Sequence, residues 1–469
     1  MASVALSPGA RADALAAIGS GELDVLVIGG GVVGAGCALD AATRGLSVGL
    51  VEARDLAAGT SSRTSKLIHG GLRYLEMLDF RLVAEALRER GLLITRLAPH
   101  LVRPVPFLYP LTHRVWERAY AGTGVALYDT LAPLTGRARG LPHHRHLTRR
   151  GARRLAPSLR KDALVGALQY HDAQVDDARF TLFLARTAAA YGARVATRAR
   201  VVGMLREGGR VSGVEVHDLE TGATIPARAR VVINATGVWT DDTQRLTGER
   251  GRFHVRPSKG VHLVVPRDRI NSETGLILRT EKSVLFVIPW QRHWIIGTTD
   301  TDWALHKAHP AASAGDIDYL LGEVNAVLTE PLGHDDVEGV YAGLRPLLSG
   351  RSESTAKLGR EHAVATPAPG LVVVAGGKFT TYRTMARDAV TVASHELGTR
   401  VPPSCTEDVP LLGADGLPAL RNRSAALAAR ARLHPARIEH LLGRYGSLIE
   451  EVLDLVAADP SLGAPLAGA

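Results

Sequence analysis

The chain has 469 residues, of which 46% are hydrophobic and 22% charged, and its formal net charge is +9. This composition is ordinary for a globular protein, and the length predicts about three domains. The two cysteines exclude a disulfide framework and are typical of a reducing compartment. The excess of arginine favours anionic partners, but no recognised nucleic-acid-binding module accompanies it, so we expect no nucleic-acid partner.

The first predicted elements are a strand, a glycine-rich turn and a helix within residues 24–45. Residues 24–28 are mostly apolar, as in a buried parallel strand, and they lead into Gly29, Gly31 and Gly34. The first glycine permits a tight turn, the second lets the backbone approach a pyrophosphate, and the third lets helix and strand pack closely. The N-terminus of the helix offers unpaired N–H groups and a partial positive charge to phosphates.

A second predicted strand, around Val48, ends at Glu52. A carboxylate about 20 residues beyond the glycines can accept hydrogen bonds from both ribose hydroxyls, and its charge disfavours a 2′-phosphate. Cys37, within the predicted helix, is expected to pack in the core rather than act as a nucleophile. Glycines also serve plain turns, but here strand, glycines, helix, second strand and acid occur together. The segment therefore predicts an adenine dinucleotide site.

Residues 59–76 follow, with the sequence GTSSRTSKLIHGGLRYLE. In a Rossmann chain this position passes the phosphates and the isoalloxazine of the cofactor. Serine hydroxyls and paired glycines suit that position, and a helical turn would place His69 and Arg73 on one face. A polar loop with a satisfied histidine is the alternative reading. We interpret the cluster as part of the site, and its cofactor-binding candidates are Ser61, Ser62, Lys66 and His69.

Residues 112–136 interleave arginines with aromatic residues and an apolar stretch. Such a segment is typical of an amphipathic helix at a membrane surface, and a simple surface helix is the alternative. No uncharged apolar run reaches the roughly 20 residues that a membrane-spanning helix needs, and the N-terminus lacks the pattern of a secretion signal.

His143, His144 and His146 lack carboxylate or cysteine support, so we predict no metal site.

Further strands are predicted at residues 193–202, 209–216 and 230–233. The last leads into the sequence NATG, which is typical of flavoprotein oxidoreductases because its small residues let the chain pass close to the cofactor. The cofactor-binding candidates from this region are Val201, Ala235 and Gly237. Four short β-rich runs then predict an antiparallel sheet able to cover a flavin, at residues 261–266, 275–279, 284–289 and 294–298.

Residues 371–381, with the sequence LVVVAGGKFTT, predict another buried strand that ends in paired glycines and a helix start. Lys378 lies at that helix start. An ammonium and the positive end of a helix would stabilise the negative charge that a reduced flavin gains. A solvated lysine is the alternative. The cofactor-binding candidates here are Gly377, Lys378 and Thr380.

These elements predict an α/β protein with a discontinuous, Rossmann-type FAD-binding domain, built from residues 20–105, 180–250 and 360–398. We assign residues 106–179 and 251–359 to a substrate domain that carries the membrane-contacting segment. Residues 405–469 form a predicted helical C-terminal domain, because the stretch around 419–458 has helical spacing and is rich in Ala, Leu and Arg.

The motifs IGGGVVGAG, GTSSRTSKLIHGGLRYLE, NATGVW, FVIPW, IIGTTDTD, GLRPL and GGKFTTYR occur in this order along the chain. Together they resemble the FAD-dependent glycerol-3-phosphate dehydrogenases, the aerobic, membrane-associated flavoenzymes. The resemblance implies a glutathione-reductase-like FAD domain, an antiparallel substrate sheet and a helical C-terminal cap. It implies oxidation of sn-glycerol 3-phosphate to dihydroxyacetone phosphate, with hydride transfer to FAD and electrons passed to quinone.

The resemblance also implies a cytoplasmic protein, peripherally associated with the inner face of the plasma membrane. A homodimer is compatible with it, and the oligomeric state stays open. The C-terminal cap is expected to be short, which leaves cap stability and dimer contacts open as well.

The resemblance implies substrate contacts from four side chains, which are Arg73, Tyr74, Arg345 and Arg360. A phosphorylated substrate carries close to two negative charges near pH 7, and the guanidinium fork suits phosphate. The catalytic candidates are His69, Arg345 and Lys378. His69 is the first candidate for the base because the ordinary pKa of histidine suits the task, and Lys378 or an arginine-bound water is the alternative.

Other functions remain as alternatives to this prediction. The same substrate can be oxidised with O₂ as the acceptor, and an amine or amino-acid oxidase of the same fold is a more distant alternative. A flavin-binding module without turnover is a third, against which the presence of His69, Arg73, Arg345 and Lys378 argues.

Overall fold

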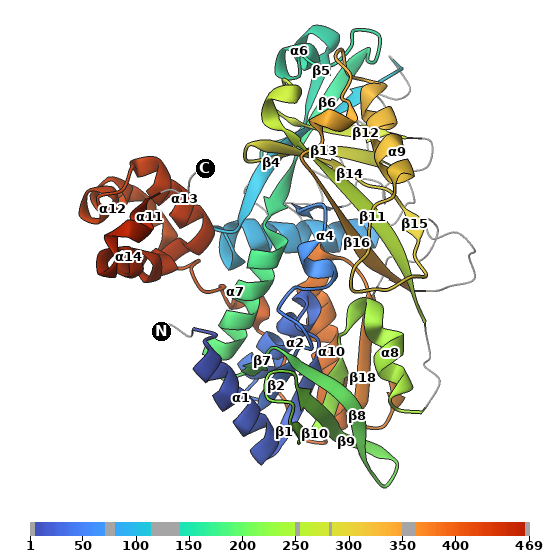
Figure 1. Ribbon diagram of the computed structural model, residues 1–469, viewed down its shortest axis with the longest axis vertical. Coiled ribbons are helices and arrows are strands. Elements are labelled where there is room, and N and C mark those ends of the chain that lie inside the picture. The colour runs from blue at the N-terminus through green and yellow to red at the C-terminus, as the bar shows by residue number, and fades with distance from the viewer. Residues whose placement is uncertain are drawn as a thin grey trace.

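The computed structural model describes residues 5–70, 80–113, 141–248, 254–280, 284–348 and 362–464. Two β-sheets lie one above the other along the long axis, and a group of helices stands to one side (Figure 1). The α/β fold class with an added helical unit is therefore confirmed.

The first sheet is a Rossmann-type sheet, with the strand order β17-β18-β10-β1-β2-β7, and β8 and β9 extend it from β10. Its central pairs β18–β10, β10–β1, β1–β2 and β2–β7 are parallel, so their carboxyl ends share one edge. The strands are β1 (Glu22–Ile28), β2 (Val48–Val51), β7 (Arg194–Ala196), β8 (Ala199–Glu207), β9 (Arg210–Asp218), β10 (Thr224–Asn234), β17 (His362–Ala368) and β18 (Leu371–Gly376).

The strand predicted at residues 193–202 is in fact two strands, β7 and β8. The chain turns between them at Arg198, whose φ is +55°. The predicted glycine-rich helix is α2 (Val32–Thr43), and Cys37 on it is fully buried, as expected of a core residue. Around the sheet lie α1 (Pro8–Ser20), α7 (Asp177–Ala190), α8 (Thr240–Arg245) and α10 (Tyr382–Glu396). Apolar faces of α2, α7 and α10 share one core with the sheet.

The second sheet has the order β15-β11-β14-β13-β12-β4-β6-β3, with β16 on β11 and β5 on β6. Its described pairs are antiparallel except β12–β4. The predicted antiparallel runs are present, in a longer sheet. Its strands are β3 (Leu67–Ile68), β4 (Val102–Leu111), β5 (Arg145–Thr148), β6 (Gly166–Val175), β11 (Val255–Pro266), β12 (Gly275–Arg279), β13 (Val284–Trp290), β14 (His293–Gly297), β15 (Thr301–Asp302) and β16 (Gly339–Leu348).

The segment between β2 and β4 joins the two sheets. It contains β3, which pairs with β6 of the second sheet, and α4 (Phe80–Leu92). The domain boundary expected at residue 105 falls inside β4. At the far end of the second sheet lie α6 (Arg149–Leu155) and α9 (Ala314–Asn325).

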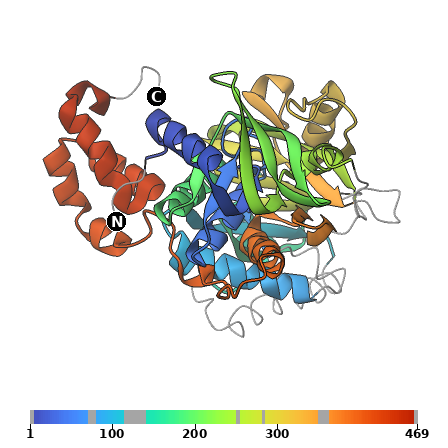
Figure 2. The same ribbon diagram turned by 90° about the horizontal axis from the view of Figure 1, so that it is seen from below.

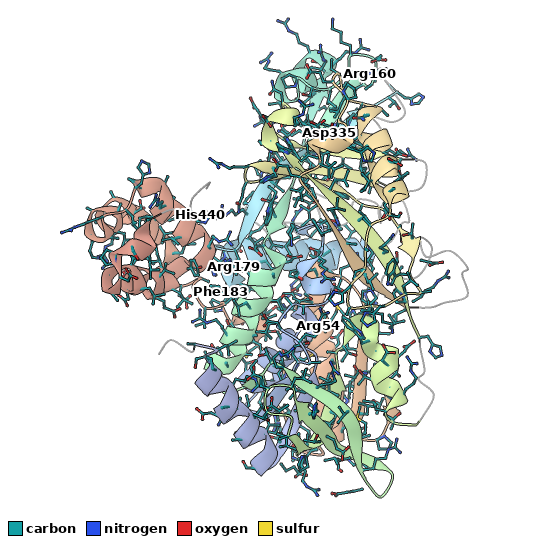
Figure 3. All side chains as sticks on the ribbon, in the orientation of Figure 1. Arg54, Arg160, Arg179, Phe183, Asp335 and His440 are labelled. Carbon is teal, nitrogen blue, oxygen red and sulfur yellow. The ribbon has the colours of Figure 1, made fainter. Side chains whose placement is uncertain are left out.

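The helical C-terminal unit has its own small core and lies beside the body of the protein, the part that contains the two sheets (Figure 2). It contains α11 (Leu417–Asn422), α12 (Ser424–Ala431), α13 (Pro435–Tyr445) and α14 (Ile449–Ala458). Contacts with α7 hold it, because Arg186 pairs with Glu451 at 2.9 Å and the Arg179 guanidinium lies 4.9 Å from the Tyr445 ring. Figure 3 shows Arg179 on α7 next to this unit.

Within the described ranges, the structure contains no helix with the length and apolar character needed to cross a bilayer. Residues 114–136 of the predicted membrane-contacting segment lie outside those ranges.

Candidate active site

The crevice at the carboxyl edge of the first sheet has the backbone geometry of a dinucleotide site. Gly29 has φ +111°, which L side chains rarely adopt, and it turns the chain from β1 toward α2. A Cβ on Gly34 would lie 1.9 Å from the Gly29 carbonyl oxygen, so this helix can approach the strand only with glycine there. The nearest atom to a Cβ on Gly31 would be the Ser61 hydroxyl oxygen, at 3.2 Å. The backbone at Gly31 therefore borders a space, here called the cradle, that a ligand can enter.

The first turn of α2 faces this cradle with backbone N–H groups. The amide of Val32 donates to the Ser61 hydroxyl at 3.0 Å, whereas the next two amides, Val33 and Gly34, have no intrahelical acceptor because they lie in the first helical turn. Free N–H groups and the positive helix end fit a pyrophosphate. The crevice therefore fits the phosphates of FAD.

Glu52 lies at the end of β2, as the sequence predicts for a ribose-binding acid. Its two oxygens accept hydrogen bonds from the amides of Gly30 and Arg54, both at 2.7 Å, and burial raises the pKa of the carboxyl. Each carboxylate oxygen retains a further lone pair for a hydroxyl donor. Glu52 is thus oriented by the backbone in the position where an adenosine ribose would lie.

The small residues after β10 lie against this turn. The amide of Ala235 donates to the Ile28 carbonyl at 2.9 Å, and a Cβ on Gly29 would lie 2.8 Å from the Ala235 carbonyl oxygen. Gly237 has φ +58° and begins η3 (Gly237–Trp239). Val201 lies in β8, which begins where the Ala199 amide donates to the Glu52 carbonyl at 2.8 Å.

A cavity opens between the two sheets, next to this crevice. The elements that line it are η1 (Thr60–Ser62) with the loop after it, β3, the strands β11, β13 and β16, and η7 (Phe379–Thr381). The lining residues are Thr60, Arg63, Thr64, Ser65, Leu67, His69, Gly260, His262, Phe286, Gly343, Leu344, Arg345, Pro346, Leu347, Gly377, Lys378, Phe379 and Thr380.

A buried carboxylate at the start of α7 fastens the loop that lines one wall. Asp177 accepts hydrogen bonds from the amide and hydroxyl of Thr64, at 3.0 and 2.7 Å, and forms an ion pair with Lys66. Lys66 also donates to the Ser62 carbonyl at 2.7 Å. Lys66 and Ser62 remain predicted cofactor contacts, and in the structure both groups also hold the loop in shape.

His69 is held at the cavity by Thr380. The His69 amide donates to the Thr380 hydroxyl at 3.2 Å, and that hydroxyl donates to the His69 carbonyl, also at 3.2 Å. The imidazole lies against Phe286, with ring centroids 6.5 Å apart. Two predicted residues that are distant in sequence therefore meet at this wall.

His262 is a lining residue that the sequence analysis missed. It lies on β11, stacks on Tyr341 with ring centroids 4.7 Å apart, and its Nε2 is 2.8 Å from the Ser65 hydroxyl. Burial, with the nearby charges of Arg345 and Lys66, lowers the pKa of His262 to about 3, so the imidazole is neutral at pH 7. The one available signal was a histidine within an otherwise apolar predicted strand.

Arg345 reaches the cavity from β16. Its guanidinium donates to the Thr299 carbonyl at 3.1 Å and to the Thr298 hydroxyl at 3.0 Å, and Asp300 lies 3.7 Å away. These contacts orient the fork beside Gly260, where a Cβ would come within 2.6 Å of it. The predicted cation is therefore positioned at the cavity rather than free on the surface.

Lys378 lines the cavity directly after Gly376 and Gly377, which have φ of +78° and +71°. Together with Arg63 and Arg345 it gives the cavity three cationic side chains, and none of the described lining residues is a carboxylate. Such a cavity attracts a small dianion. Arg73, Tyr74 and Arg360 lie outside the described residues.

Comparisons with known proteins agree with this geometry. Residues 24–389 match the family model for FAD dependent oxidoreductases, and residues 404–469 match the C-terminal domain of alpha-glycerophosphate oxidase. Over 462 residues the chain is 62% identical to glycerol-3-phosphate dehydrogenase 2 of Mycobacterium tuberculosis, covering 98% of this chain and 78% of that protein. The chain belongs to the FAD-dependent glycerol-3-phosphate dehydrogenase family.

More distant members of the glycerol-3-phosphate dehydrogenase family match over nearly the whole chain. The human mitochondrial enzyme is 39% identical over 477 residues, covering 96% of this chain and 63% of that protein. The crystal structure of the Bacillus halodurans enzyme complexed with FAD has a TM-score of 0.79 at 30% identity, and covers 96% of this chain and 81% of that one. The predicted family, fold and FAD dependence are thus confirmed.

Proposed function

We propose that this chain oxidises sn-glycerol 3-phosphate to dihydroxyacetone phosphate. The observation that carries the proposal is a cavity next to the FAD crevice with Arg63, Arg345 and Lys378 on its walls, and none of its described lining residues is a carboxylate. A substrate with a phosphate of nearly two negative charges matches that cavity. The names of the relatives at 62% and 39% identity point to the same substrate.

The substrate must lose a hydride from carbon 2 and a proton from the hydroxyl on that carbon. FAD, when bound, supplies the two-electron acceptor for the hydride. The guanidinium of Arg345 binds the phosphate and so orients carbon 2. A base takes the hydroxyl proton, and His69 on the described lining is the proposed base; His262, whose pKa is lowered to about 3, is too weak a base for that step.

A single anaerobic experiment tests this function. We expect the purified protein to be yellow. Its visible flavin absorbance should bleach when glycerol 3-phosphate is added. Glycerol and an L-amino acid are the matched negative controls. Bleaching by the amino acid, or persistent colour with glycerol 3-phosphate, would contradict the proposal.

The acceptor of the electrons is proposed to be a quinone. Support comes from the match to dehydrogenases, and from a basic surface that would bring the chain to the lipid phase where quinones reside. After anaerobic reduction, a water-soluble quinone should restore the yellow colour much faster than air-saturated buffer does. Equal or faster recovery with O₂, together with stoichiometric peroxide, would favour an oxidase instead.

Peripheral attachment to a membrane is proposed for the end of the second sheet that carries α6. The sequence RRGARRL forms this helix, and Arg149, Arg150 and Arg154 on it are exposed. Exposed arginines attract anionic lipid headgroups, each contributing about 1 kcal/mol near the surface. The proposed location is cytoplasmic, at the inner face of the plasma membrane, and a homodimer is compatible with it.

Vesicle sedimentation tests the attachment. The protein should sediment with vesicles containing anionic lipid at low salt and stay in solution with neutral vesicles. The variant Arg150→Glu with Arg154→Glu should bind less, whereas Arg228→Glu, at an exposed arginine of the first sheet, should bind as the wild type. Equal binding by both variants would contradict a role for α6.

A further inference from the structure

The loop of residues 303–313 connects β15 of the second sheet to α9. It nevertheless contacts the FAD-binding part of the chain. It leaves β15 at the Trp303 amide, which donates to the Pro257 carbonyl at 3.2 Å. It ends at Ser313, which caps α9 through reciprocal hydrogen bonds with Asp316. Both ends are thus anchored in the second sheet and its covering helix.

The first contact between this loop and the FAD-binding part is an ion pair. The Lys307 ammonium lies 2.6 Å from a carboxylate oxygen of Asp242. Asp242 is on α8, the helix that follows β10 and η3. This side of the loop is therefore tied to the chain beyond the carboxyl end of β10.

The second contact is made by the next residue, Ala308, with the chain that follows β2. The carbonyl of Ala308 accepts hydrogen bonds from Arg54 at 3.4 Å and from Arg63 at 3.3 Å. Both arginines come from the segment that follows β2, and Arg54 lies near the boundary of the two sheets in Figure 3. Burial, together with the nearby Arg54 guanidinium, lowers the pKa of Arg63.

The loop around these two contacts is held in shape by its own side chains. The indole N–H of Trp303 donates to the His306 carbonyl at 3.2 Å, and the Ala308 amide donates to the His306 ring at 3.3 Å. His306 stacks on His309 with centroids 6.0 Å apart and planes 9° from parallel. A loop with this internal support can hold its position without help from a ligand.

Because the strand order is β10-β1-β2, a loop whose adjacent residues Lys307 and Ala308 contact the chain after β10 and the chain after β2 lies near the carboxyl end of β1, between them. That end carries Gly29, Gly31 and the start of α2, where the FAD pyrophosphate fits. We propose that residues 303–313 are a strap across the FAD crevice, and that the Lys307–Asp242 ion pair is the latch that slows FAD release.

The inference rests on the FAD binding described above, and it assigns Lys307 and Asp242 a positioning role rather than a catalytic one. An alternative is that the loop is merely a brace between the two parts. If the loop only braces the two parts, a variant that weakens it would lower the free energy of unfolding. The rate of FAD release would stay unchanged.

The test is the rate at which the holoenzyme releases FAD after dilution, followed by the fluorescence of free FAD. Partly exposed ion pairs contribute modestly, so Lys307→Ala and Asp242→Ala should each speed release about 2- to 5-fold. Since Asp242 also pairs with Arg245, a double-mutant cycle isolates the latch. The double variant should release FAD no faster than the faster single variant.

The matched control is Arg269→Ala, which removes an ion pair of 2.6 Å with Asp336 that stays within the second sheet and its connections. It should release FAD at the wild-type rate. Wild-type release by Lys307→Ala, multiplicative effects in the double variant, or faster release by the control would each overturn the strap. Purification of the wild type without FAD would instead contradict the proposed function itself.

Discussion

At the scale of single residues, the active site depends on charged groups whose partners orient them without neutralising them. The Arg345 guanidinium donates to the Thr298 hydroxyl and the Thr299 carbonyl. Its distance to the Asp300 carboxylate is 3.7 Å, which is long for an ion pair. His262 stays neutral because protonation would place a buried positive charge beside other cations. The cavity therefore has positive charge for a phosphate, and the His262 imidazole beside it stays uncharged.

Arg345→Ala should raise the KM for glycerol 3-phosphate by about 10- to 100-fold, because charged hydrogen bonds contribute about 1.5–3 kcal/mol. Steady-state kinetics and the flavin content of the purified variant measure the effect. Arg345→Lys should recover part of the loss, since it restores the charge but not the fork. The control is Arg256→Ala, at a partly exposed arginine that pairs with Asp302. An unchanged KM for Arg345→Ala would remove this residue from the phosphate site.

His69→Asn should lower the rate of anaerobic flavin reduction by about 10²–10⁴-fold, the usual contribution of a group that accepts the proton. The comparison variant is Tyr341→Phe, which keeps the ring stacked on His262 and loses a hydrogen bond to the Thr64 carbonyl. It should reduce flavin at nearly the wild-type rate. A normal rate for His69→Asn would exclude His69 as the group that accepts the proton.

At the scale of elements, the site depends on where helices and strands begin and end. The loop between β2 and β3 holds its shape because Asp177, the first residue of α7, is fully buried and accepts three donors from Thr64 and Lys66. Burial raises the pKa of the Asp177 carboxyl, and the Lys66 ammonium opposes that effect. The start of one helix thereby sets the wall of the cavity.

Asp177→Asn should destabilise the protein by about 3 kcal/mol, because it leaves the largely buried Lys66 ammonium without its carboxylate. Urea unfolding of the holoenzyme measures the change. The double variant Asp177→Leu with Lys66→Met should be more stable than Asp177→Asn, since it removes both charges. A loss below about 0.5 kcal/mol for Asp177→Asn, typical of surface substitutions, would show that the pair does not hold the loop.

At the scale of the whole molecule, buried neutral histidines connect stability to pH. His100 is fully buried against Phe183, where the body meets the C-terminal unit, and burial lowers its pKa to about 4. Figure 3 shows Phe183 on the side of α7 that faces that unit. Between the ordinary value of 6.5 and about 4, the unfolded chain binds a proton at His100 that the folded chain does not.

The free energy of unfolding should therefore fall as the pH falls from about 6.5 to about 4. His100→Leu should make this fall less steep, whatever its effect at pH 7. The exposed His395→Gln is the control and should keep the wild-type slope. Chemical unfolding at several pH values measures the slopes. An unchanged slope for His100→Leu would mean that His100 does not contribute to the acid sensitivity.

Local patterns were enough to predict the dinucleotide crevice. Gly29, Gly34 and Glu52 lie within one strand-helix-strand unit, so their spacing along the chain determines their spacing in space. The antiparallel runs of the second sheet were predictable for the same reason, because short strands and turns are local. The parallel contact of β12 with β4 was not, since the two strands are far apart in sequence.

The composition of the cavity was decided by contacts between distant segments. His262 meets Ser65 across 197 positions, and Lys66 meets Asp177 across 111. Neither the missed histidine nor the structural role of Lys66 has a signature in its own neighbourhood. The strap is a similar case, because Lys307 contacts a helix 65 positions earlier in the chain.

By itself, the sequence determined that this chain has an adenine dinucleotide site in a Rossmann-type domain, since the glycines, the acid and the flanking strands form one continuous unit. The tertiary structure alone decided which cations and imidazoles share the cavity and which loop lies near the cofactor crevice. The physical reason is that periodicity and spacing report on neighbours along the chain, whereas burial and charge pairing arise only when remote segments pack together.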